Sequence, residues 1–76
     1  MMKKILARLD EIDKALAEYA EQYAKGEIQR ETYNILGNRR RWERYGIKET
    51  LKAFGIELVK GEGGWTIRPY EEEVSA

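Results

Sequence analysis

The chain has 76 residues, which bounds it to one domain with a thin hydrophobic core. It contains no cysteine and no histidine, so disulfides, thiolate metal sites and imidazole chemistry are excluded. Basic and acidic residues number 14 each, and a net charge of zero argues against strong non-specific binding to polyanions.

The charge is unevenly distributed along the chain. Residues 1–28 carry five positive and six negative groups, a net of −1. Residues 29–60 carry eight positive and four negative groups, a net of +4, and residues 61–76 carry one and four, a net of −3. A basic patch in a neutral chain still acts within a Debye length of about 8 Å. The middle of the chain is therefore where a polyanion would bind.

The first predicted element is a long helix over residues 2–25. Its apolar side chains recur at alternating spacings of three and four, which gives a two-per-heptad seam. Gly26 follows, and glycine ends many helices in a left-handed conformation. Charged residues off the seam, among them Arg8 and Asp13, are expected on a solvated outer face. The seam, which is the predicted self-association surface, consists of Met2, Ile5, Leu9, Ile12, Leu16, Tyr19 and Tyr23.

A second helix is predicted to begin near Gln29 or Arg30, after a short turn. Short turns between helices make antiparallel neighbours, so the two helices should form a hairpin. Ile28, Ile35 and Trp42 are seven residues apart. We expect this row to face the first helix, which would make Trp42 a core residue.

Glycines divide the rest of the helical region. Gly37 should weaken the second helix and Gly46 should break or kink it, since an interior glycine costs about 1 kcal/mol relative to alanine. A short third helix is then predicted over residues 47–54, with apolar residues on one face and Gly55 at its end.

The hydrophobic period changes from helical to two after Gly55. Residues 56–60 and 65–68 are predicted strands of a β-hairpin whose glycine-rich loop is residues 61–64. The predicted architecture is α+β and mostly helical, with a single domain over residues 1–70. Residues 71–76 are predicted to be an acidic, disordered tail.

The predicted helices differ in length, because the second helix would span only about 24 Å before Gly46 against about 36 Å for the first. The first turns of the first helix, with Met2, Ile5 and Leu9, would therefore extend beyond the second helix and would need another element to bury them. Either the third helix and the ribbon fold back over them, or a second chain does.

Few residues are suited to catalysis. The only serine is Ser75, in the predicted tail, and the glycine-rich segment matches neither a dinucleotide fingerprint nor a P-loop. Asp10 and Asp13 are spaced to hold Mg²⁺ weakly, but solvated surface is the better interpretation, so no metal site is predicted. We therefore expect neither an enzyme nor a cofactor, and we infer no small-molecule substrate.

The segment GNRRRWERYG, residues 37–46, concentrates basic and aromatic residues. On a continuous helix, its cations and those that follow would form a basic ridge able to follow a phosphate backbone, with Trp42 and Tyr45 near enough to stack on bases. Glu43 and Glu49 partly neutralise this ridge, which favours the alternative of a solvated helix face. The residues of the predicted nucleic-acid surface are Arg39, Arg40, Arg41, Arg44, Lys48 and Lys52.

Two segments resemble known families. AKGEIQRETYNIL, residues 24–36, resembles the short bacterial helical-hairpin domain called SHOCT, on Gly26, Ile28 and Tyr33. Gln29 stands where that family favours a helix-capping threonine. The resemblance implies a helical interaction or oligomerisation element and no chemistry.

The segment IKETLKAFGIELVKGEGGWTIRP, residues 47–69, is similar to the C-terminal end of cysteinyl-tRNA synthetases, where a helix is followed by a strand, a glycine turn and a tryptophan strand. The catalytic domain of that family is missing, so the resemblance implies at most an RNA-facing role. The matching residues are Leu51, Gly55, Ile56, Gly64 and Trp65.

The sequence thus predicts a small, non-enzymatic protein-interaction or regulatory module that self-associates through its first helix. Its partner would be a second copy or another protein. The alternative is a nucleic-acid-binding accessory protein that uses the basic ridge. Because no apolar run approaches the roughly 20 residues that span a bilayer, we expect a soluble, cytoplasmic protein.

Overall fold

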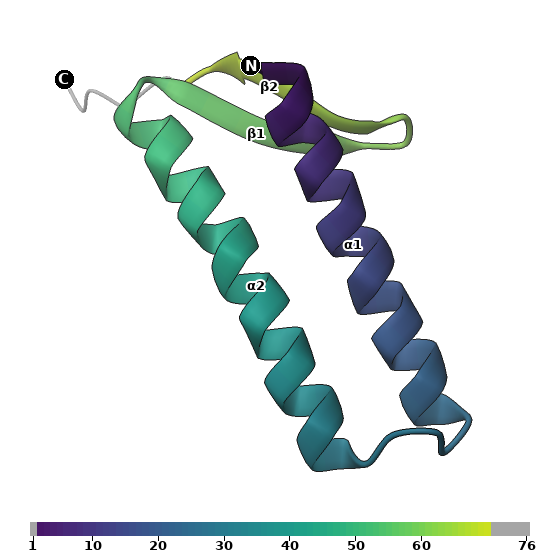
Figure 1. Ribbon diagram of the computed structural model, residues 1–76. Helices are drawn as coiled ribbons and strands as arrows, with labels where there is room; N and C mark the ends of the chain where they lie inside the picture. The colour runs from purple at the N-terminus through teal and green to yellow at the C-terminus, as the bar shows by residue number, and fades with distance from the viewer. Residues whose placement is uncertain (1, 71–76) are drawn as a thin grey trace, which may run out of the picture.

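The computed structural model describes residues 2–70 and contains two helices followed by a two-stranded antiparallel sheet (Figure 1). The sheet crosses the end of the helical hairpin at which the first helix begins and the second helix ends (Figure 1). This confirms the predicted α+β, mostly helical class and both hairpins. The predicted tail, residues 71–76, lies outside the described residues. The elements are α1 (Met2–Ala24), α2 (Arg30–Ala53), β1 (Ile56–Gly61) and β2 (Gly64–Pro69).

The predicted third helix is wrong, because α2 continues through Gly46 to Ala53. No atom lies within 4 Å of the point where a Cβ at Gly46 would stand, and the Thr50 hydroxyl donates a hydrogen bond of 2.8 Å to the Gly46 carbonyl. An interior glycine costs about 1 kcal/mol. Burial of Leu51 alone contributes about 1.5–3 kcal/mol, so an unbroken helix that holds Leu51 against the core is favoured.

The two helices are matched in length. With 23 and 24 residues, they rise about 35 and 36 Å. The expected mismatch in length was therefore wrong, since it depended on a break at Gly46. Because the helices match in length, a second chain is not needed to cover the first turns of α1.

Two glycines turn the chain where the helices end. Gly26 has a φ of +76° and Gly55 a φ of +77°, a region that only glycine adopts readily. The amides of Gly26 and Gly55 donate to the carbonyls of Tyr23 and Lys52, at 3.0 and 2.9 Å, which satisfies the last turn of each helix. The chain therefore reverses after α1 and enters the sheet directly after α2.

The β-hairpin is tighter than predicted. Gly61 pairs with Gly64, so the turn contains two residues instead of four. Leu58 is opposite Ile67 and lies on the face toward the helices, whereas the opposite face carries an ion pair between Glu57 and Arg68 at 2.8 Å. One face of the ribbon is apolar and the other polar, which explains the period of two in the sequence.

The hydrophobic core lies at the ribbon end of the molecule. Leu9 is fully buried and packs with Leu51 and Leu58, so each of α1, α2 and β1 contributes one leucine. The ribbon thus covers the first turns of α1, which was one of the two predicted ways to bury them. The side chains that pack around this cluster are Met2, Ile5, Leu6, Ile47, Ile56 and Trp65.

The other end of the helical hairpin is less well packed. Residues 13–36 are all described, and none of them is buried. Leu16, Tyr19 and Leu36 are only half-buried, and the ring of Tyr23 stacks on that of Tyr33 at 4.8 Å near the connecting turn. We call this region, residues 13–36, the distal half of the hairpin.

Candidate functional site

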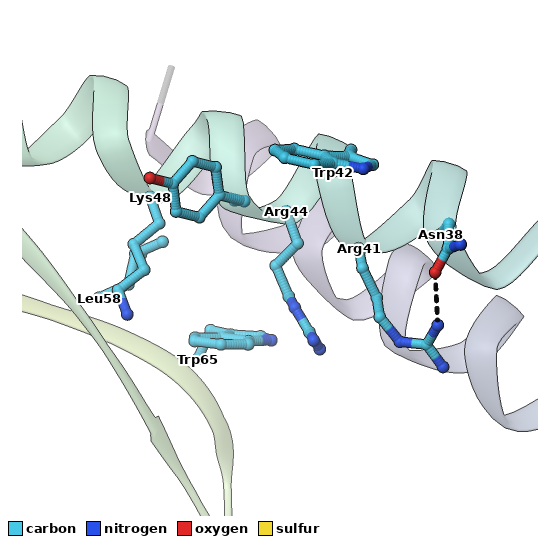
Figure 2. A pocket seen from close by; sticks show the side chains of 8 residues that line it. Asn38, Arg41, Trp42, Arg44, Lys48, Leu58 and Trp65 are labelled. Carbon is cyan, nitrogen blue, oxygen red and sulfur yellow. Dashed lines mark hydrogen bonds between the residues drawn. The ribbon is translucent and has the colours of Figure 1, made fainter.

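An open hollow of about 610 Å³ lies between the side of α2 and the ribbon. Arg44 extends from α2 toward Trp65 of the ribbon, and Arg41 lies beside it (Figure 2). The lining of the hollow combines aromatic rings, cations and one core leucine. The lining residues are Asn38, Arg41, Trp42, Arg44, Tyr45, Lys48, Leu58 and Trp65.

The aromatic wall on α2 is exposed. Trp42 is 70% exposed and Tyr45 is 53% exposed, and their rings meet edge to face with centroids 5.8 Å apart. The expectation that Trp42 belongs to the core is therefore wrong. Ile35, one heptad earlier, is also exposed, so this row of α2 faces solvent.

The inward face of α2 follows a different row. Its members are spaced 3, 4, 3 and 4 and are all buried or half-buried, although the row includes two arginines. An apolar pattern could not reveal this row, because two of its members are arginines, which Asp13 of α1 and Glu43 of α2 compensate. The row consists of Gly37, Arg40, Arg44, Ile47 and Leu51.

Asp13 of α1 connects the ribbon to both helices. Its carboxylate accepts hydrogen bonds from Arg44 Nη1 at 3.0 Å, from Lys60 Nζ at 2.6 Å and from Trp65 Nε1 at 2.7 Å. Partial burial would raise the pKa of Asp13, but these three donors outweigh it and hold the pKa below its ordinary value. Asp13 therefore remains charged and fixes the ring of Trp65 at the edge of the hollow.

A second carboxylate joins the helices. Glu43 of α2 accepts two hydrogen bonds from the guanidinium of Arg8 on α1, and the one from Nη2 measures 2.8 Å. Arg40 Nη1 lies 3.3 Å from the same carboxylate, and hydrogen bonds from Arg8 and then Arg40 lower the pKa of Glu43. The expectation that Arg8 and Asp13 belong to a solvated outer face is therefore wrong. The sequence offered one signal, since both are adjacent in sequence to buried seam residues.

The structure separates the six predicted phosphate-binding residues. Arg41, Arg44 and Lys48 line the hollow, and Arg41 donates a hydrogen bond of 3.3 Å to Asn38 Oδ1. Arg40 faces α1 beside Glu43, as described above. Arg39 and Lys52 lie outside the lining, and Lys52 Nζ stands 5.2 Å from the ring of Tyr70.

The seven predicted seam residues divide along α1. Leu9 and Ile12 are buried within the chain, and Met2 and Ile5 pack around the leucine cluster. Tyr23 is 41% exposed. Leu16 and Tyr19, which are half-buried, belong with Tyr23 to the distal half of the hairpin, where part of the seam stays accessible.

Residues 2–70 contain no cluster of three or more carboxylates able to hold a metal ion. No helix among them is both long and apolar enough to cross a membrane.

Comparison with known proteins identifies no relative. No protein-family model, curated protein or solved structure matches this chain.

Proposed function

We propose that this chain is a non-enzymatic, nucleic-acid-binding accessory protein and that the hollow between α2 and the ribbon is its binding surface. The observation that carries the proposal is the exposure of Trp42, which is 70% accessible within a lining that also contains three cations. Trp42 and Tyr45 are both exposed and in contact, and an exposed apolar patch with a polar rim marks an interaction site. Cations around such a ring favour an anionic ligand that also has aromatic faces.

The charges of the hollow are not all equally available. Arg44 is ion-paired with Asp13, whereas the side chain of Lys48 forms no ion pair among residues 2–70 and interacts with Glu57 only through its charge. The guanidinium of Arg41 donates its hydrogen bond to the neutral amide of Asn38. Arg41 and Lys48 therefore supply the cationic charge for phosphate, and Arg44 supports the wall formed by Trp65.

The proposal is tested by measuring binding of a labelled oligonucleotide by fluorescence anisotropy over a range of salt concentrations. The double variant Arg41→Ala/Lys48→Ala should bind more weakly and lower the slope of log K against log salt by about 1.4, since each phosphate contact contributes about 0.7 on single strands. The matched control is Lys25→Ala/Arg30→Ala, which removes the same residue types near the connecting turn and should bind normally. Absence of binding by the wild-type protein at low salt, or an equal loss in the control, refutes the proposal.

A second candidate function is supported by the distal half of the hairpin. Leu16, Tyr19 and Tyr23 lie there on α1 without full burial, and a 76-residue domain has little core of its own. These three side chains are the accessible part of the seam through which a protein-interaction module would self-associate. Leu16→Glu should then dissociate an oligomer seen by light scattering, with Lys14→Glu as the control. A monomer mass that does not change with concentration removes this candidate.

A further inference from the structure

The Trp65 ring offers the hollow a face and not its polar edge. Trp65 Nε1 already donates to Asp13 at 2.7 Å, and Lys60 Nζ stands 5.1 Å from the ring centroid of Trp65. The Trp65 ring is therefore held as a fixed apolar wall whose only hydrogen-bond donor is occupied. A ligand cannot be recognised by a hydrogen bond from this ring.

The opposite wall is also aromatic. Trp42 leaves 70% of its surface accessible, and Tyr45 supports it edge to face with an interplanar angle of 90°. The one side-chain amide in the lining is that of Asn38, whose oxygen accepts a hydrogen bond from Arg41 (Figure 2). The hollow thus presents ring faces on two sides, which suits stacking.

The cations stand on both sides of the exposed ring. Arg41 and Lys48 are seven residues apart on one continuous helix, which separates their backbones by about 10.5 Å along the axis. Trp42 and Tyr45 lie between them in the sequence and also line the hollow. A nucleotide stacked on Trp42 would therefore have a cation on each side for its flanking phosphates.

We infer that the hollow binds single-stranded nucleic acid by stacking unpaired bases on Trp42, against the wall formed by Trp65, with Arg41 and Lys48 on the adjacent phosphates. This inference rests on the proposed function and specifies its ligand. Bases in a duplex are already stacked on one another and expose no face to Trp42, so duplexes are excluded as the preferred ligand. Because contact is through ring faces, binding depends weakly on base identity.

Tryptophan fluorescence reports directly on this hollow, because both tryptophans of the chain line it. The 76-residue chain is titrated with oligothymidylate, with an abasic oligomer of equal length, and with a duplex of equal phosphate number. Stacking predicts strong quenching by oligothymidylate and at least severalfold tighter binding than to either of the other two. It also predicts that Trp42→Leu lowers the affinity for oligothymidylate by about five- to a hundredfold, with Trp42→Phe between it and the wild type.

Trp42 suits this test because its exposure allows replacement without disturbing the core, which far-UV circular dichroism checks. Equal affinity for the abasic oligomer without quenching overturns base stacking but leaves phosphate binding, and hence the proposed function, in place. A duplex that binds as tightly as the single strand also overturns the inference. Failure of all three probes overturns both proposals. If polyglutamate binds tightly and quenches the fluorescence while oligothymidylate does not, the hollow binds an acidic protein segment. That result overturns both the stacking inference and the proposed function.

Discussion

At the scale of single residues, two carboxylates determine how the helices and the ribbon meet. Asp13 and Glu43 each accept hydrogen bonds from cations of another element, and the side chain of Asp13 is only 22% exposed. Charge-assisted hydrogen bonds of this kind are about twice as strong as neutral ones. These contacts let arginines occupy the inward row of α2, where an apolar residue would be expected.

Replacing Asp13 by asparagine should destabilise the protein by about 1–2 kcal/mol at neutral pH, because three donors lose a charged acceptor. Urea unfolding measures this. Asp10→Asn, an exposed aspartate on the same helix, is the control and should change the free energy of unfolding little.

The effect of Asp13 should depend on pH. Its pKa is lower in the folded than in the unfolded chain, so its contribution is complete above the unfolded value of about 3.9 and is lost as pH falls through the folded pKa. The penalty of Asp13→Asn should therefore shrink on acidification below about pH 4. A penalty that is unchanged there, or that the control reproduces, contradicts the role given to Asp13.

These contacts could not be found from the sequence. Asp13 lies 31, 47 and 52 residues from its three donors, and local spacing carries no information on pairs so far apart. The same reason applies to Trp42, because the side of α2 that faces α1 depends on where those ion pairs form. The cationic residues of the hollow were predicted from their concentration in residues 37–48, but the contribution of Trp65 and Leu58 to it was not.

At the scale of elements, the continuity of α2 is the main difference from the sequence-based prediction. A helix that passes through Gly46 and two helices separated there have the same apolar positions, since Ile47 and Leu51 recur with helical spacing in either case. The difference is decided by tertiary packing, which holds Leu51 in the core and so keeps the last turns in line with the rest. The helical period of α1, the end at Gly55 and the period of the ribbon are local signals, and these were predicted correctly.

A continuous α2 predicts opposite effects of alanine at two glycines. Gly46→Ala should raise the free energy of unfolding by about 0.5–1 kcal/mol, because the site is helical and has open space for a methyl group. Gly55→Ala should lower it by about 1 kcal/mol or more, because φ is +77° there. Denaturant titrations of both variants measure these changes. A destabilising Gly46→Ala would indicate a break at that residue.

At the scale of the whole molecule, the structure is elongated and its core lies at one end. It measures 51 × 25 × 21 Å, with a radius of gyration of 15.1 Å against about 11 Å for a compact domain of this length. The ribbon end holds both the leucine cluster and the hollow, so the proposed binding surface stands beside the core. Tyr19 and Tyr23 of the residual seam lie toward the connecting turn, whereas the hollow is lined by residues 38–48 of α2 and by Leu58 and Trp65 of the ribbon.

This separation allows one measurement to test the central claim, which is that nucleic acid binds in the hollow. In a two-dimensional ¹H–¹⁵N spectrum, the indole peaks of Trp42 and Trp65 report on the hollow. The amides of residues 19–33, which exclude Asp13 and the residues next to Asn38, report on the distal half. Addition of a short single-stranded oligonucleotide should shift both indole peaks and the amides of residues 38–48 and leave the distal amides in place. Unmoved indole peaks, or shifts confined to the distal half, would contradict the assignment of the hollow as the binding surface.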